Sequence, residues 1–259
     1  MSADPWSSVA SLYEWEHAEF DLDLATYLGL ARRTGGPILE AACGTGRLAI
    51  PLAVAGYAVV GVDSSPEMLA VARARLATAL PTAERLKLLL ADVRGLDVPQ
   101  RFGLAILALD GLGLFLEVQD QVVMLQTLWR HLRRGGLLAL DVANGAALDE
   151  SPTEELRHHY TRPHPEHGRP LTKWVARQTD RARQMHALTL WYDEMADAGT
   201  LRRTVVQYRL RYFYRFELQL LLERAGFLVE GLYGNYDLGP LEGPSERLIA
   251  VARRPDSSD

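Results

Sequence analysis

The sequence predicts an α/β fold with a doubly wound, Rossmann-like sheet and a smaller antiparallel sheet added to it. From residue 37 to about 144, short apolar runs alternate with amphipathic stretches. This alternation is typical of parallel strands that helices bury on both faces. After residue 144, three strand-like segments follow one another without an intervening helix, which indicates the second sheet. The main sheet is expected to be mostly parallel, with an antiparallel C-terminal strand.

Five strands of the main sheet are expected in the first half of the chain. They are the apolar runs 37–40, 57–62, 86–90, 102–109 and 137–142. Helices are expected over 47–55, from Ser64 onward, and over 120–133. Ser64 as a cap, an early proline at Pro66 and Glu67 three residues after Ser64 are typical of a helix start.

The second half of the chain predicts the added sheet and a return to the main one. Residues 151–170 are rich in proline, histidine and charge, which predicts a loop. Strands are expected over 174–178, 185–193 and 202–209, with a hairpin turn at 197–199. A helix over 216–225 and two closing strands, 227–233 and 247–252, follow. The expected division is 1–150 for the N-terminal helices and cofactor-binding core, 151–212 for the lid sheet, and 213–259 for the return and a short disordered tail.

The composition narrows the function classes. The formal net charge of −5 over 259 residues argues against a broad nucleic-acid surface. Residues 1–10 lack a basic patch followed by an apolar run, and no apolar stretch is long enough for a membrane span. The single cysteine, Cys43, excludes an internal disulfide. We therefore expect a cytoplasmic protein without a nucleic-acid or membrane partner. A homodimer stays open, since the lid sheet could pair across two copies.

Acidic residues follow each of the first four expected strands. They are Glu40, Asp63, Asp92 and Asp110. In an open α/β sheet, ligands bind beyond the C-terminal ends of the strands, where these carboxylates would gather. The two glycines of the first strand-to-helix turn, at positions 44 and 46, let a backbone approach a ligand closely.

The acids indicate a nucleoside ligand. Glu40 precedes Gly44 by four residues, a position that suits an ammonium group better than a pyrophosphate. Asp63 can accept hydrogen bonds from both hydroxyls of a ribose, although NAD enzymes use the same device. Asp92 is placed to accept from an adenine amino group, and Met68 could pack on the adenine face.

Four segments in this order resemble the motifs of class I S-adenosylmethionine-dependent methyltransferases. The run 38–47 resembles the glycine-rich first motif, 61–69 the acidic second, 91–93 the third, and 132–137 the turn before the fifth strand. The resemblance covers about residues 36–144 and implies S-adenosylmethionine as cofactor, with S-adenosylhomocysteine as product. The residues expected at the cofactor are Tyr13, Glu40, Ala42, Gly44, Gly46, Arg47, Asp63, Ser64, Met68, Asp92, Val93 and Leu109.

The flanking segments resemble a narrower group, the small-molecule N-methyltransferases of the glycine and amino-sugar type. That group often carries an N-terminal tyrosine at the methyl-transfer site, which implies a catalytic role for Tyr13. It also carries a small antiparallel lid, matched here by residues 174–209, and later elements resembled by 211–217 and 233–237. The resemblance implies a small-molecule acceptor, an amine by preference. The residues expected to line its pocket are Asp110, Tyr214, Tyr233 and Tyr236.

Several alternatives stay open at this stage. Residues 109–115 are largely apolar where relatives often carry polar or histidine side chains, so Asp110 is the only ionisable group there. A non-catalytic S-adenosylmethionine-binding protein, an NAD-dependent oxidoreductase, and a protein or RNA methyltransferase are the competing interpretations. The histidines at 158, 159, 164 and 167 match no strong ligand spacing, so no metal is expected. The sequence does not decide between nitrogen, oxygen and carbon as the methylated atom.

Overall fold

The computed structural model describes residues 4–79, 84–148, 154–195 and 199–256. Its main sheet has seven strands in the order β10-β11-β5-β4-β1-β2-β3. β1 to β5 are mutually parallel, and β11 runs antiparallel to both β5 and β10. The predicted sheet, with its reversed C-terminal strand, is confirmed. The strands are β1 Ile38–Ala41, β2 Val59–Asp63, β3 Leu86–Leu90, β4 Phe102–Leu107, β5 Leu132–Ala143, β10 Leu228–Tyr233 and β11 Arg247–Arg253.

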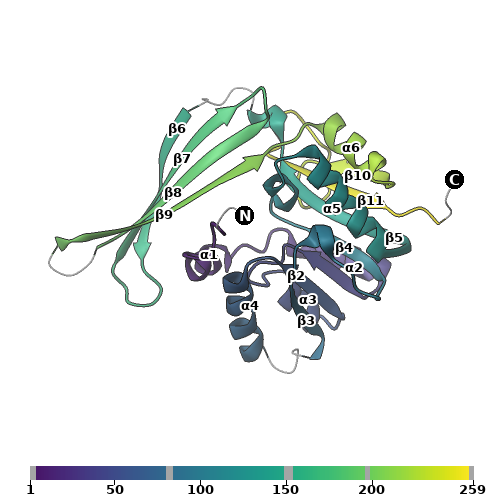
Figure 1. The fold of residues 1–259 in the computed structure, drawn as a ribbon, viewed down its shortest axis with the longest axis horizontal. Helices are drawn as coiled ribbons and strands as arrows, with labels where there is room; N and C mark the ends of the chain where they lie inside the picture. The colour runs from purple at the N-terminus through teal and green to yellow at the C-terminus, as the bar shows by residue number, and fades with distance from the viewer. Residues whose placement is uncertain (1–3, 80–83, 149–153, 196–198, 257–259) are drawn as a thin grey trace.

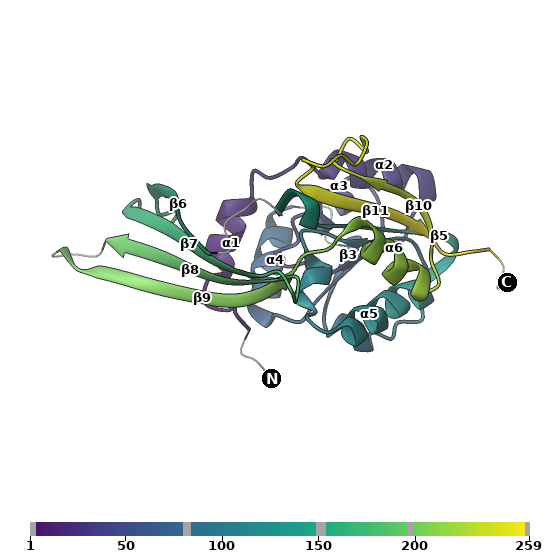
Figure 2. The same cartoon turned by 90° about the horizontal axis from the view of Figure 1, so that it is seen from above.

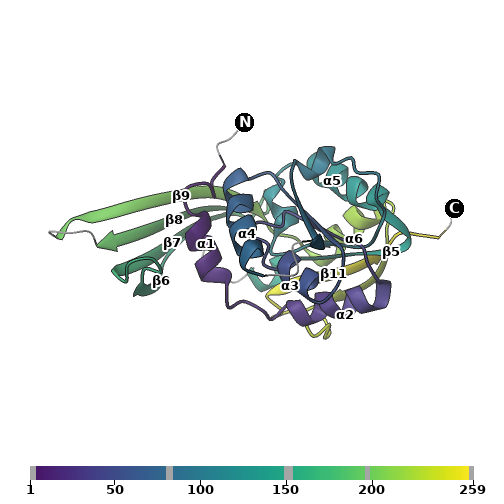
Figure 3. The ribbon, with the colours of Figure 1, turned by 90° about the horizontal axis from the view of Figure 1, so that it is seen from below.

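Helices cover both faces of this sheet, as Figures 2 and 3 show from opposite sides. Helix α2 (Leu24–Thr34) and helix α3 (Ala49–Val54) contribute to one apolar cluster. Helix α5 (Val118–His131) and helix α6 (Arg215–Arg224) contribute to the other. β1 and β4 lie between the two clusters with every residue buried, which explains why their sequences are continuous apolar runs apart from Glu40.

The remaining two helices lie toward the second sheet. Helix α1 (Ala10–His17) and helix α4 (Pro66–Thr78) are neighbours in Figure 1. The cap of α4 is Ser65, one residue after the predicted Ser64, because the Ser65 hydroxyl accepts the Met68 N–H at 3.2 Å. Pro66 occupies the first helical position, where its missing N–H removes no intrahelical bond.

A four-stranded antiparallel sheet projects from the main domain (Figure 1). Its order is β6-β7-β8-β9, and we call it the lid sheet. The strands are β6 Glu154–Pro163, β7 Pro170–Asp180, β8 Met185–Met195 and β9 Leu201–Arg211. Side chains alternate between its faces, and the inner face is the one that carries Lys173, Tyr192, Val206 and Tyr208.

The predicted loop over 151–170 is wrong for residues 154–163, which form β6. β6 is an edge strand that pairs with β7, and most of its side chains are exposed. Backbone hydrogen bonds to β7 support such an edge strand, so its sequence needs no regular apolar alternation. The predicted turn at 197–199 lies largely outside the described residues. The domain boundaries at 150 and 212 stay a prediction.

A buried ionic network joins four other segments of the chain to the carboxyl end of β5. The Asp141 side chain is fully buried. Its carboxylate accepts hydrogen bonds from the Tyr27 hydroxyl at 2.9 Å, the Leu109 N–H at 2.9 Å, the Tyr236 hydroxyl at 3.0 Å and the Arg247 guanidinium. Arg247 also donates to Asp110 at 2.7 Å. Neither Asp141 nor Arg247 was singled out from the sequence.

Replacing Arg247 by methionine should destabilise the fold strongly. It would leave the carboxylates of Asp110 and Asp141 without their shared cation, and an uncompensated buried charge costs about 3–5 kcal/mol. The measurement is the free energy of unfolding in urea. Arg33→Met is the matched control, because the exposed Arg33–Glu230 pair should contribute less than about 1 kcal/mol. Equal losses in the two variants would contradict this account of the network.

Candidate cofactor and acceptor site

The loop between β1 and α3 adopts three left-handed backbone conformations. Ala42, Gly44 and Gly46 have φ values of 53°, 52° and 76°. Left-handed geometry costs roughly 1–2 kcal/mol for a residue such as alanine, and such strain clusters at ligand sites. At Gly46 an added Cβ would also lie 3.2 Å from the Ile50 side chain, so this position needs glycine for space as well.

Asp63, at the end of β2, is held between this loop and the start of α4. Its two carboxylate oxygens accept the Gly44 N–H at 2.7 Å and the Ser65 N–H at 2.9 Å. Burial raises its pKa, while these backbone bonds act in the opposite direction. Each oxygen keeps a further lone pair, so the oriented carboxylate can still accept from two ribose hydroxyls.

Glu40 is a carboxylate buried at the base of the same loop. It is 4% exposed, and its Oε2 atom has no hydrogen-bond partner among the described residues. Burial raises its pKa to about 8, with Arg47 acting against the shift. The Thr45 hydroxyl nearby is likewise buried without a partner. An unpartnered buried carboxylate and hydroxyl fit the ammonium group of an amino-acid moiety, as in S-adenosylmethionine.

Arg47, by contrast, is already fully engaged. It forms a bidentate pair with Asp23, with both N–O distances 2.6 Å, and donates to the Phe20 carbonyl at 3.1 Å. Its guanidinium therefore ties the segment before α2 to the cofactor loop. In the site, Arg47 supports the loop.

The adenine side of the site is formed by the ends of β2 and β3. Met68, on the first turn of α4, and Val93, in the short 3₁₀ helix after β3, are both buried. Asp92 is exposed and pairs with Arg94, whose Nη2 lies 2.6 Å from Oδ2. Arg94 lowers the pKa of Asp92 and donates to both of its carboxylate oxygens, so an amino group would share Asp92 with this arginine.

Tyr13 on α1 lies above this loop. After burial, the charges that shift its pKa are those of Arg47, Asp63 and Glu40, which places the phenol within electrostatic reach of the cofactor carboxylates. Burial raises its pKa to about 12, so the hydroxyl stays protonated at neutral pH. Its ring stacks on His17 with centroids 4.0 Å apart.

Tyr208, on the inner face of the lid sheet, approaches from the opposite side. Trp6 connects the two phenols, with its ring 4.8 Å from that of Tyr208 and 5.4 Å from that of Tyr13. Burial and the charge of Asp110 raise the pKa of Tyr208. A role for Tyr208 could not be predicted from the sequence, because alternation in β9 does not tell which face of the strand meets the core. Tyr13 and Tyr208 are thus linked through Trp6, and Tyr208 lies within electrostatic reach of Asp110.

The other residues predicted to line the acceptor pocket, Tyr214, Tyr233 and Tyr236, lie in three different places. Tyr236 donates to Asp141 and belongs to the buried network behind Asp110. The Tyr214 ring packs against Gly145, just beyond β5. The Tyr233 phenol lies over Gly231 and therefore points back along β10. Leu109 and Asp110 adopt left-handed conformations, with φ values of 47° and 63°.

Two further groups invite a functional interpretation. Among the described residues, the histidines at 164 and 167 with Glu194 are the one group of three metal-ligand side chains close together. Both histidine Nδ1 atoms accept backbone N–H groups, and the His167 Nε2 lies 3.2 Å from Glu194, which favours a hydrogen-bonded cluster. Cys43 is buried against Gly61, and burial raises the pKa of its thiol, which opposes a nucleophilic role.

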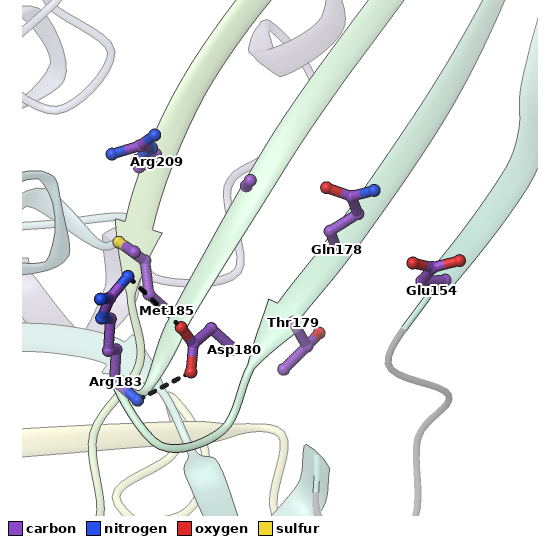
Figure 4. A pocket seen from close by; sticks show the side chains of 8 residues that line it. Glu154, Gln178, Thr179, Asp180, Arg183, Met185 and Arg209 are labelled. Carbon is purple, nitrogen blue, oxygen red and sulfur yellow. Dashed lines mark hydrogen bonds and ion pairs between the residues drawn. The ribbon is translucent and has the colours of Figure 1, made fainter.

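A polar hollow lies at the root of the lid sheet. Figure 4 shows Glu154, Gln178, Asp180, Arg183 and Arg209 around it. Arg209 follows Tyr208 in β9, so the hollow opens on the face opposite to the inner one. It is separate from the carboxyl edge of the main sheet.

Comparison with known proteins agrees with this geometry. A family model described as "Methyltransferase domain" matches residues 38–136. The cypemycin N-terminal methyltransferase of a Streptomyces species is 26% identical over 221 residues, which are 85% of this chain and 84% of that protein. The putative methyltransferase YqeM of Bacillus subtilis is 28% identical over 56% of this chain, and the match spans only 58% of that protein.

A solved structure extends the similarity to the whole fold. The CcbJ methyltransferase from Streptomyces caelestis superposes with a TM-score of 0.76 at 25% identity. The match covers 91% of this chain and 90% of that one, so it includes the lid sheet as well as the main sheet.

The carboxylates, the strained glycine loop and these matches define the class of the molecule. The chain is an S-adenosylmethionine-dependent methyltransferase with the fold of the class I enzymes, and residues 38–136 match the methyltransferase domain model. The interpretation as an NAD-dependent oxidoreductase is thereby set aside. Within the described ranges, no helix is long and apolar enough to cross a membrane.

Binding of S-adenosylmethionine at pH 7 should release a proton from Glu40. With a pKa of about 8, the carboxyl is mainly protonated in the free protein, and an adjacent ammonium would favour its ionised form. Calorimetry in buffers of different ionisation enthalpy should report a release approaching about one proton, absent in Glu40→Gln. Glu67→Gln, at an exposed position on α4, is the control. Equal proton release in wild type and Glu40→Gln would show that Glu40 does not meet the ammonium.

Proposed function

We propose that this enzyme transfers the methyl group of S-adenosylmethionine to the nitrogen of a small-molecule amine. The observation that carries the proposal is the grouping of Tyr13, Tyr208 and Asp110 around Trp6, residues that would line the acceptor cleft. Phenols and a carboxylate favour the positive charge that a nitrogen acceptor gains during methyl transfer.

Three acidic residues would each bind a different part of the cofactor. Glu40 would hold the ammonium, Asp63 the ribose hydroxyls, and Asp92 the adenine amino group. When bound, the cofactor supplies a methyl group that its sulfonium makes strongly electrophilic. The task left to the protein is alignment, which can supply roughly 7–11 kcal/mol of the barrier.

The charge distribution in the cleft supports nitrogen as the acceptor atom. During transfer to an amine, positive charge moves from sulfur to nitrogen. Asp110 would face the atom that gains it, an electrostatic stabilisation realised in the transition state. Tyr13 and Tyr208 stay protonated, so their oxygens can accept an N–H hydrogen bond while neither acts as a base. A neutral amine needs no base in this step.

A relative's name, the net charge and two exposed side chains of the lid sheet support the proposed acceptor, location and dimer. The cypemycin enzyme carries N-terminal methyl transfer in its name, which agrees with a nitrogen acceptor. The net charge of −5 agrees with a small molecule in preference to a nucleic acid, and with action in the cytoplasm. The exposed Leu156 and Val205 on the outer face of the lid sheet would support pairing in a homodimer, which sedimentation would establish or refute.

The test is an acceptor screen. The wild-type enzyme is incubated with S-adenosylmethionine and a panel of small primary and secondary amines, with alcohols and phenols as comparison. S-adenosylhomocysteine and an acceptor one methyl group heavier are followed by mass spectrometry. Methylation of an amine supports the proposal. Methylation of an alcohol or phenol while every amine stays unchanged would refute the choice of nitrogen.

Removing the phenolic oxygen of Tyr13 or of Tyr208 should slow methyl transfer without weakening the binding of S-adenosylmethionine. Tyr13→Phe and Tyr208→Phe keep the rings that pack on Trp6 and remove one hydrogen-bonding atom each. We expect kcat to fall by roughly tenfold or more, about 1.4 kcal/mol, with the Kd of S-adenosylmethionine nearly unchanged. Tyr57→Phe, between α3 and β2, is the control. Wild-type kcat in either cleft variant would assign that tyrosine to packing alone.

A further inference from the structure

Helix α1 bears a carboxylate that is bound to three donors on the lid sheet. The Glu16 side chain is 8% exposed. It accepts from Lys173 Nζ at 2.7 Å and from the Tyr192 hydroxyl at 3.2 Å, and it also accepts from the Tyr160 hydroxyl. The donors come from β6, β7 and β8, so one carboxylate joins three neighbouring strands to α1.

This cluster is buried beside apolar side chains. The surrounding cluster includes Val9 of the N-terminal segment and Leu171, Leu190 and Val206 of the lid sheet. A buried ion pair contributes little net stability compared with apolar residues of the same size. What it can add is a unique arrangement, because a shifted helix would leave Glu16 and Lys173 charged and unpaired. Burial and the charge of Glu16 raise the pKa of Tyr160 and Tyr192, so both hydroxyls remain donors.

The opposite side of α1 is bound to the cofactor loop. Glu14 pairs with Arg75 of α4, with N–O distances of 2.8 and 3.1 Å. The same guanidinium donates to the Thr45 carbonyl at 2.8 Å. Tyr13 therefore lies on a single helix that is attached to the lid sheet through Glu16 and to the loop through Glu14.

We propose that Glu16 is a positioning residue for methyl transfer: through Lys173, Tyr160 and Tyr192 it holds α1 in the one register that places the Tyr13 phenol over the cofactor loop. The inference rests on the proposed function, because it takes Tyr13 as a residue of the methyl-transfer cleft. Misplacing a reacting group by about 1 Å can lower the rate a hundredfold, so a small shift of α1 would lower kcat.

The test compares Glu16→Gln with a milder variant and a matched control. Tyr192→Phe removes one of the three donors and keeps the ring, so it should fold even where Glu16→Gln does not. Glu19→Gln makes the same chemical change at an exposed position just beyond α1. We expect kcat to fall by roughly tenfold in Glu16→Gln and by a smaller factor in Tyr192→Phe, with the Kd of S-adenosylmethionine within about twofold of wild type.

A double-mutant comparison separates positioning from general stability. If Glu16 acts through Tyr13, Glu16→Gln should have little further effect on kcat in a Tyr13→Phe background. Equal factors in both backgrounds, or an unchanged kcat in the single variant, would overturn the proposal. A loss of kcat equal to that of Glu19→Gln would overturn it as well.

Amide hydrogen exchange gives a readout that needs no acceptor. Residues 10–17 should exchange faster in Glu16→Gln and Tyr192→Phe than in wild type, while β1 and β4 keep their protection. Unchanged exchange in α1 would refute the attachment even if no amine were found to be methylated. Failure of the acceptor screen with altered exchange would, in turn, refute the amine proposal and leave the attachment of α1 supported.

Discussion

The carboxyl edge of the main sheet depends on one buried carboxylate, that of Asp141. A fully buried carboxylate is unfavourable unless its lone pairs are satisfied, and here four donors from separate parts of the chain do so. The Leu109 N–H is one of them, and the Asp110 N–H bonds to the Asp141 carbonyl at 3.1 Å. The network thereby stabilises the two left-handed residues after β4 and fixes the direction of Asp110.

The same network explains how several carboxylates can lie close together at this edge of the sheet. Arg247 is shared between Asp110 and Asp141, so the pair of carboxylates carries one compensating cation. At the other end of the edge, Asp63 is stabilised by backbone N–H groups, and Glu40 avoids a buried charge by staying mainly protonated. Negative charge is thus held at Asp63 and at the Asp110–Asp141 pair, whereas Glu40 would become charged only beside a bound cation.

Elements with a clear local sequence pattern could be predicted from the sequence. Buried parallel strands appear in the sequence as apolar runs, so the main sheet could be predicted directly, and the acids at the strand ends predict a cofactor site there. β6 was missed because an edge strand can be polar throughout. Asp141 did leave a signal, a charge within the apolar run 137–142, but its partners Tyr27 and Arg247 are distant in sequence. Only the reversed pairing of β11 with β5 brings Arg247 beside it.

The acceptor side was harder to predict for a related reason. Tyr208 and Glu16 are ordinary residues of an alternating strand and a short helix, and neither pattern shows what lies across from it. The roles proposed for them depend on the packing of α1 between the lid sheet and α4. The cofactor side is thus built from a contiguous segment with recognisable spacing, whereas the acceptor side is assembled from distant elements. Acceptor choice can therefore change through the lid and α1 while the cofactor motifs stay the same, so the motifs identify the methyl donor and leave the acceptor to the geometry.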